Sequence, residues 1–200
     1  MQRFMTQYRT SAAHGFTLIE LVIVVLILGI IAVIVTPKFI NFTDDSHQVS
    51  VENTAAALRA SIVSHQALWN IDGSGAQVRD LVGSQGDALD MNAQGYPIGL
   101  NVTNGQLNNN RIGVQGENNI HGCRDIWNSL LTQAPTVSNN NDGADYEYYR
   151  HTGGRLCGFV YRKAGDTVNG RANVQLGILY DSRVGSISLC GQSVAGTPSC

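Results

Sequence analysis

The sequence predicts an α+β protein in which a long amino-terminal α-helix packs on a small antiparallel β-sheet head. Three observations support this fold class. An apolar run extends from Leu18 to Val35, a stripe of apolar residues at helical spacing follows it, and residues of alternating polarity appear near the carboxyl terminus. The chain has 200 residues, enough for one domain and an appendage.

The apolar run contains 18 residues and one charge, Glu20. This length is sufficient to cross a membrane. Arg3 and Arg9 give the basic start of a secretory signal, but the run is longer than a signal core and no small-residue cleavage motif follows it. A carboxylate in a spanning helix costs about 2.5–3.5 kcal/mol near the centre and less toward an end, so Glu20 needs a partner.

A partner for Glu20 arises if the chain is cut between Gly15 and Phe16. Phe16 then carries a new α-amino group, which is cationic at neutral pH, one helical turn from Glu20. Opposite charges about 4 Å apart attract by roughly 4 kcal/mol at an effective dielectric constant of 20. Whether Glu20 meets the amine of its own chain or of a neighbouring copy remains open at this stage.

The segment Gly15-Phe16-Thr17-Leu18-Ile19-Glu20, followed by an apolar run and Pro37, resembles the type IV prepilins. The tract PKFINFTDDS is further similar to pilins of the mannose-sensitive haemagglutinin (MSHA) type. The resemblance implies that a dedicated inner-membrane prepilin peptidase cleaves after Gly15 and methylates Phe16. It also implies that Glu20 is needed for efficient assembly. A leader of 15 residues is long for the family, and Met5 is an alternative start.

The same resemblance implies partners and a location. The subunit would cross the inner membrane once, bind the pilus assembly platform, and polymerise with itself or with other pilins. The product would be an extracellular pilus of a Gram-negative bacterium used for adhesion, with host or surface glycans as candidate receptors. The expected parts are a leader (1–15), a hydrophobic transmembrane and polymerisation helix (16–37), an amphipathic helix that continues it (38–71) and a globular head (72–200).

The second half of the helix is predicted from spacing. Apolar residues recur at intervals of three and four and share one helix face, with a single histidine among them: Val51, Ala55, Leu58, Ile62, His65 and Trp69. We expect His65 to be a packing residue. A straight helix from Phe16 to Ile71 would be about 84 Å long. Pro37 predicts a kink, Gly29 is a second weak point, and the resemblance implies that the segment between them loosens in the filament.

The head is predicted to combine Gly- and Asn-rich connections with a carboxyl-terminal sheet. Two stretches are amphipathic, 76–89 and 123–131. Strands are expected at 156–162, 172–180 and 184–189, with a tight turn at 181–183 and a further strand at 111–115. The tract DYEYYRHTGG contains Tyr146, Tyr148 and Tyr149, which either form a sugar-binding surface or pack under the edge of the sheet.

Four cysteines lie beyond the apolar run, with no C-x-x-C pair. An even number of cysteines after a membrane or export segment favours disulfides in an oxidising compartment. A carboxyl-terminal tail frays unless it is held, which favours pairing Cys190 with Cys200 and therefore Cys123 with Cys157, one of three arrangements. Type IV pilins often close this region with such a loop.

The sequence contains no motif for an enzyme, a cofactor or a nucleotide. Asp142, Asp145 and Glu147 lack the spacing of a calcium loop, and we expect no metal. Without its first 15 residues the chain has 11 Lys and Arg (13 less Arg3 and Arg9) against 15 Asp and Glu, so we expect no nucleic-acid binding. The alternatives are a type II secretion pseudopilin, which the four cysteines disfavour, and a DNA-uptake pilin. The choice between a major and a minor subunit stays open.

Overall fold

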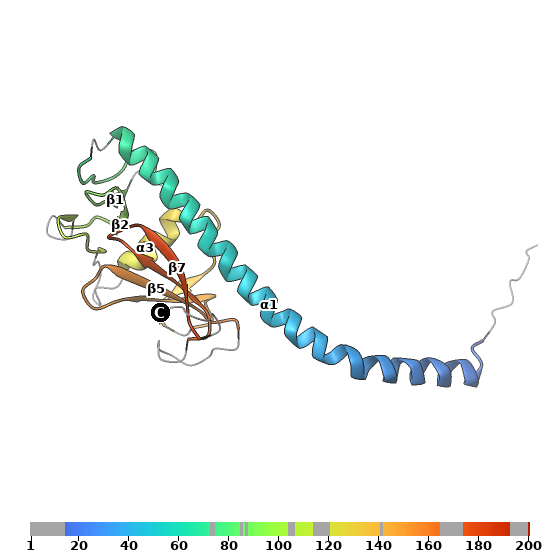
Figure 1. The fold of residues 1–200 in the computed structure, drawn as a ribbon. Helices are drawn as coiled ribbons and strands as arrows, with labels where there is room; N and C mark the ends of the chain where they lie inside the picture. The colour runs from blue at the N-terminus through green and yellow to red at the C-terminus, as the bar shows by residue number, and fades with distance from the viewer. Residues whose placement is uncertain are drawn as a thin grey trace, which may run out of the picture. The chain divides into compact units, whose positions relative to one another are not determined.

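The computed structural model describes residues 15–72, 75–84, 86, 88–103, 107–113, 121–140, 142–164, 174–192 and 200, with only the backbone for 36–44. The chain divides into two compact units, 1–43 and 44–200. Helix α1 (Leu18–Asp72) contributes to both units, which are considered separately below. The architecture is α+β, as the sequence predicts (Figure 1).

In the first unit, α1 begins at Leu18, two residues later than the sequence suggests, because Thr17 caps it. All the side chains from 15 to 34 are exposed. Gly29 lies inside the continuous helix, and a Cβ added there would meet no atom within 4 Å. The kink stays a prediction, and the side chain of Pro37 lies outside the described residues.

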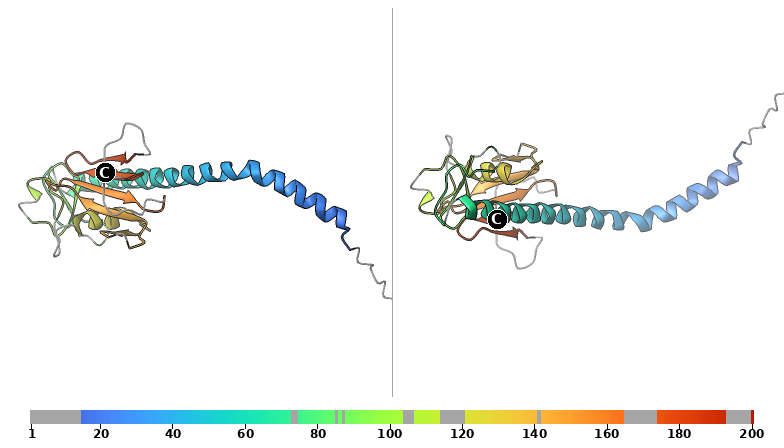
Figure 2. Two further views of the ribbon diagram at one scale, coloured as in Figure 1. Left: turned by 90° about the horizontal axis from the view of Figure 1, so that it is seen from below. Right: turned by 90° about the horizontal axis from the view of Figure 1, so that it is seen from above.

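In the second unit, the rest of α1 buries one face against the head, which confirms the predicted stripe. Its fully buried members are Val51, Ala55, Leu58, Ile62 and Trp69. His65 is half-buried at the edge of this face, and its Nδ1 donates to the carbonyl oxygen of Ser61 at 2.8 Å. Figure 2 shows this part of α1 running along the head in both views.

The main sheet has five strands in the order β3-β4-β5-β6-β7. They are β3 (Val137–Ser138), β4 (Tyr146–Arg150), β5 (Leu156–Tyr161), β6 (Gly177–Asp181) and β7 (Ser186–Cys190). Every pair is antiparallel except β3 with β4, where two residues pair in parallel. The last three are the predicted strands with adjusted ends. The turn between β6 and β7 covers 182–185, longer than expected, and its Gly185 adopts a φ of 64°.

Strand β4 corrects both interpretations of the tyrosine-rich tract. Tyr146 and Tyr148 are buried in the core, and Tyr149 is half-buried on the other face of the sheet. β4 pairs with β3 on one side and β5 on the other, so it is not an edge strand. Alternation of the side chains between two covered faces explains why three of its five residues are aromatic.

The amphipathic stretch 76–89 is not a helix in its described part. Residues 76–84, 86 and 88 form turns and one bridge before strand β1 (Leu89–Met91), and Asp80, Gly83 and Gly86 adopt positive φ angles there. The predicted strand at 111–115 is not found in its described part. Residues 111–113 form no strand, and 114–115 lie outside the described residues. The amide of Gly113 instead donates to Ile98 of strand β2 (Pro97–Leu100), which pairs with β1.

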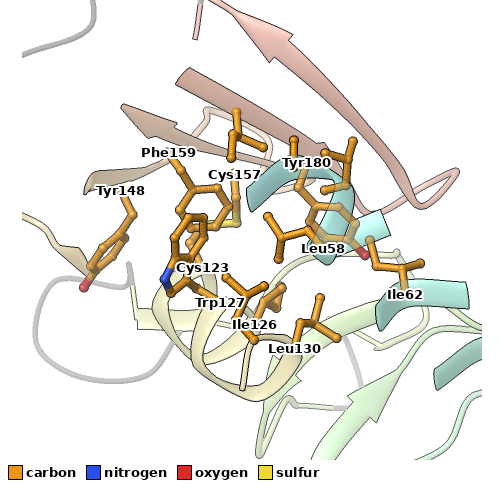
Figure 3. Packing of buried hydrophobic residues seen from close by; sticks show 14 of the residues in the cluster. Leu58, Ile62, Cys123, Ile126, Trp127, Leu130, Tyr148, Cys157, Phe159 and Tyr180 are labelled. Atoms are coloured by element: carbon orange, nitrogen blue, oxygen red, sulfur yellow. A yellow bond between two sulfur atoms is a disulfide. The ribbon is translucent and has the colours of Figure 1, made fainter. Parts of the chain in front are cut away.

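The core lies on one face of the main sheet, where α1 and helix α3 (His121–Leu130) pack side by side. Trp127 of α3 packs its ring 4.5 Å from Phe159 and 4.7 Å from Tyr146, and its Nε1 donates to the carbonyl oxygen of Pro135 at 2.9 Å. A disulfide joins Cys123 of α3 to Cys157 of β5. Figure 3 shows Leu58 and Ile62 of α1 pointing into the same cluster.

The opposite face of the sheet is covered near its centre by the second disulfide, Cys190–Cys200. The two pairs in the structure are therefore the pairs expected from the sequence. A Cβ on Gly177 would lie 2.7 Å from the Sγ of Cys200, so this glycine provides the space for the bridge. On the same face, Glu147 of β4 and Arg162 form a buried ion pair with an N–O distance of 2.5 Å.

Candidate functional site

The residues singled out at the amino terminus form a capping box at the start of α1. The amide and the hydroxyl of Thr17 both donate to Oε2 of Glu20, at 2.9 Å each. The amide of Glu20 donates back to Oγ1 of Thr17 at 3.3 Å. A capping box satisfies backbone N–H groups that the first helical turn leaves unpaired. Thr17 and Glu20 therefore fix the first residue of the helix.

This arrangement leaves Gly15 and Phe16 outside the helix, where both residues are exposed and belong to no helix or strand. The peptide bond between Gly15 and Phe16 is separated from the capping residue, Thr17, only by Phe16. A protease needs its substrate in an extended conformation, since a helical peptide bond is held in intrachain hydrogen bonds. The cap thus separates a cleavable segment from the helix that follows.

The carboxylate of Glu20 keeps one oxygen available for a second partner. Oε2 accepts both bonds from Thr17, and Oε1 has no hydrogen bond to any residue that the structure describes. An amine at the end of a cleaved chain could bind Oε1 without breaking the cap. The geometry is compatible with the amine of the same chain or of another copy.

From Leu21 to Val35, α1 is apolar on every side. Within the described residues, α1 provides one segment that is long and apolar enough to cross a membrane, Leu18–Val35, with a mean hydropathy of 3.4 and none of it buried. From Leu18 to Ile34, the exposed fractions of the large apolar side chains range from 47% at Val24 to 80% at Leu18, and Val35 is half-buried. An aqueous environment strongly disfavours this exposed surface, so lipid or other helices must cover it.

A second apolar stripe runs along the outer face of α1 in the head unit, opposite the buried one. Its members recur at intervals of seven, four, three, four and four, and all are exposed: Val49, Ala56, Ala60, Val63, Ala67 and Ile71. Val63 is 66% exposed and Ile71 is 82% exposed. Alanines at helical spacing allow another helix to approach closely. We call this surface the outer stripe.

The acidic tract proposed as a weak calcium candidate does not converge on one point. Glu147 is bound to Arg162 inside the head, whereas Asp145 accepts from the hydroxyl of Thr136 at 2.7 Å and Asp142 from Ser138 at 2.7 Å. No cluster of three or more metal-binding side chains exists among the residues that the structure describes.

Sequence reasoning missed two features of this site. The T-x-x-E signature of a capping box is readable at Thr17–Glu20, but the acidic residue was considered only as an ionic partner. The outer stripe was missed because alanines carry a weak hydrophobic signal, and the buried stripe of the same helix dominates the pattern.

Comparison with known proteins supports the amino-terminal assignment. Residues 10–36 match the model of the prokaryotic N-terminal methylation motif. The chain is 51% identical over 49 residues to the type IV narrow pilus major component PilA5 of Thermus thermophilus. This match covers 24% of the present chain and 42% of the relative, so it spans less than half of the relative's length. No solved structure matches the chain. The amino-terminal segment thus matches a prokaryotic N-terminal methylation motif and is similar to part of a type IV pilus subunit.

Proposed function

We propose that this protein is a structural subunit of an extracellular type IV pilus. In this proposal, prepilin peptidase cleaves between Gly15 and Phe16 and methylates Phe16, and the assembly platform extracts the subunit from the inner membrane into a filament. The leader would be 1–15, the membrane and polymerisation helix 16–37, its amphipathic continuation 38–71 and the head 72–200. Gly29 and Pro37 would be the points at which the helix bends or loosens.

The proposal rests on the exposed apolar surface of α1. Within each of the two units, the other described residues leave this surface uncovered. From Phe16 to Ile34 every apolar side chain is exposed, and the outer stripe continues this character as far as Ile71. A membrane can cover the first part before assembly. Only other helices can cover both parts outside the cell, and other copies of the same chain supply such helices in a polymer.

Glu20 would set the position of each subunit along such a polymer. A rod of apolar helices has little preference for one axial position over another, because apolar contacts are not directional. A carboxylate in this environment is costly unless an opposite charge reaches it. The new Phe16 amine of a neighbouring copy, bound at Oε1, would favour a single axial position.

The amino-terminal mass of the protein from cells with an active prepilin peptidase tests the processing step. We expect a chain that begins at N-methylated Phe16, and a chain that retains Met1 or Met5 would refute the proposal. Gly15→Asp should block cleavage. Glu20→Val should leave cleavage intact and abolish most filaments seen by electron microscopy. Asp72→Val, which removes an exposed carboxylate from the other end of the same helix, serves as the matched control.

The finer assignment is an MSHA-like pilus that mediates surface adhesion. It rests on the similarity of the tract PKFINFTDDS, and a gene deletion that leaves surface attachment unchanged would refute it. A type II secretion pseudopilin shares the same processing signal, and long extracellular filaments in electron micrographs would exclude it. A DNA-uptake pilin would require filaments that retain duplex DNA in a salt-dependent manner.

A further inference from the structure

We propose that the two ends of the main sheet are complementary docking surfaces, so that the arginine-rich end of one copy contacts the carboxylate-rich end of another copy in the filament. This inference rests on the proposed function and deepens it by naming a subunit interface. The arginine end consists of Arg111, Arg150 and Arg155. The acidic end consists of the carboxylates Asp45, Glu52, Asp142 and Asp145.

The arginine end lies at the turn that joins β4 to β5. Arg150 is the last residue of β4, and Arg155 directly precedes β5. Arg150 donates from Nε and Nη2 to the carbonyl oxygen of Ile112 at 3.2 and 3.0 Å, which brings the neighbouring Arg111 to the same turn. Arg155 donates to the carbonyl oxygen of Asn109 at 3.0 Å. Backbone carbonyls therefore hold the guanidinium groups of Arg150 and Arg155, and Arg111 lies next to Ile112, whose carbonyl oxygen binds Arg150.

None of the three arginines forms a salt bridge with a carboxylate among the residues that the structure describes, although the charge of Arg155 contributes to the lowered pKa of Asp181 nearby. Asp181, the carboxylate at the same end of β6, is already bound to Arg183 with an N–O distance of 2.6 Å. Burial and the nearby charge of Arg111 lower the pKa of Arg150, as mutual repulsion within the group requires. Arg111 and Arg155 are exposed and can reach an external anion.

The acidic end lies at the opposite ends of the same strands. Asp142 and Asp145 occupy the loop that leads into β4, and hydrogen bonds from Ser138 and Thr136 lower their respective pKa values, which keeps them ionised. The part of α1 that bears Asp45 and Glu52, about two helical turns, is attached at this end. The Nδ1 of His47 lies 3.2 Å from the hydroxyl of Tyr161, the last residue of β5. The cation at this end, Lys163, lies 3.9 Å from Asp145 and offsets part of the charge.

The two ends cannot neutralise each other within one head. A five-residue strand such as β4 separates them by about 17 Å. This separation is about twice the Debye length of ~8 Å at physiological ionic strength, so the attraction between them is screened. Contact with the opposite end of another copy brings the charges together. Such a contact joins two different surfaces and is heterologous, which generates an open helical filament when the rotation does not close.

Charge reversal in the full-length chain, expressed in cells with an active assembly machinery, tests this interface. One variant reverses the exposed arginines (Arg111→Glu with Arg155→Glu), and a second reverses the exposed acidic end (Glu52→Arg with Asp142→Arg). A third variant combines all four changes. Arg150 and Asp145 are left unchanged because they are half-buried and hydrogen-bonded, whereas the four changed residues are exposed. Arg124→Glu, at a half-buried arginine of α3 that belongs to neither docking surface, is the control for the arginine variant.

We expect each two-site variant to lower the yield of sheared filaments about tenfold, since like charges then face each other. The four-site variant should recover most of the wild-type yield, and Arg124→Glu should assemble normally. Intact disulfides and near-UV circular dichroism would show that each head is folded.

Three results would overturn the inference. If the wild type forms filaments and the two-site variants give the same filament yield, the interface is refuted and the proposed function stands. The same conclusion follows if the four-site variant gives no higher filament yield than the two-site variants. If the arginine variant assembles normally but its filaments no longer bind duplex DNA that wild-type filaments bind, the arginine end is a nucleic-acid site and not a subunit interface. Absence of wild-type filaments would refute the proposed function itself, and this inference with it.

Discussion

In the proposed filament, helix α1 would use opposite faces for folding and for assembly, and a pair of truncations five residues apart separates the two roles. Leu58 is 1% exposed within the core between α1, α3 and the sheet. Leu58→Ala should lower the free energy of unfolding of the head by about 3 kcal/mol, within the 2–5 kcal/mol typical of buried Leu→Ala changes. Val63 is 66% exposed on the outer stripe, and Val63→Ala should change the same quantity by less than about 0.5 kcal/mol.

The effect of Val63→Ala should appear on assembly instead. The change removes two carbons, each contributing about 0.8 kcal/mol when fully buried. If a neighbouring helix covers the two thirds of the side chain that is now exposed, each subunit loses about 1 kcal/mol of filament stability. This corresponds to a roughly fivefold higher concentration of unassembled subunits at equilibrium.

Near-UV circular dichroism of the detergent-solubilised full chain during urea titration measures the first effect, with Trp127 as the core signal. The ratio of filament to membrane-bound subunit, read from quantitative immunoblots, measures the second. Val63→Ala unfolding as easily as Leu58→Ala would refute the assignment of the two faces. Leu58→Ala with unchanged unfolding would refute it as well.

Three further predictions concern the cap, the second disulfide and the acidic loop. Thr17→Ala should weaken the start of α1 by about 1 kcal/mol and speed hydrogen exchange of the first helical amides, whereas Thr17→Ser should behave as wild type. Gly177→Ala should destabilise the head by about 1–3 kcal/mol, because its Cβ would lie 2.7 Å from the Sγ of Cys200 and 2.8 Å from the carbonyl oxygen of Phe159. Free thiols at Cys190, detected by alkylation and mass spectrometry, would report it, and an unchanged thiol content with unchanged stability would contradict it. Hydrogen bonds from Thr136 lower the pKa of Asp145 from 3.8, so its stabilising effect exists above that value and is lost as the pH falls. The difference in unfolding free energy between wild type and Asp145→Ala should therefore shrink from pH 7 to pH 3, and a difference that grows toward acid pH would be inconsistent with it.

The helix and its buried face could be predicted because their signals are strong and local. An 18-residue apolar run and a stripe with regular spacing of three and four each indicate a helix without reference to the rest of the chain. The strands β5 to β7 could be predicted for the same reason, since the alternation of polar and apolar residues can be read within one segment. Their exact ends were not, because they depend on pairing partners distant in sequence.

The middle of the head shows where local signals fail. Residues 76–89 have an amphipathic pattern, yet Gly83 and Gly86 take positive φ angles of 85° and 71°, and the segment folds into turns. β4 was missed because both of its faces are covered, so its polar residue Glu147 is buried in an ion pair and breaks the expected alternation. Glu147 is buried because it pairs with Arg162, which lies 15 residues further along the chain. A sequence window of ordinary length centred on Glu147 does not include Arg162.

The sequence raised the question of a carboxylate inside an apolar helix, and the structure changes the physical basis of its answer. Before cleavage Glu20 is not an unpaired charge, since its Oε2 accepts two hydrogen bonds from Thr17 and completes the cap. The cap also places Gly15 and Phe16 outside the helix, so in the proposed function one carboxylate would support both cleavage and the later ionic contact. A Glu20→Gln variant distinguishes these roles. It retains an oxygen for the Thr17 hydrogen bonds but cannot attract the Phe16 amine as a charge, so cleavage should proceed and filament assembly should fail. Equal assembly of Glu20→Gln and wild type would show that the hydrogen bonds of the cap, rather than the charge, are what assembly requires.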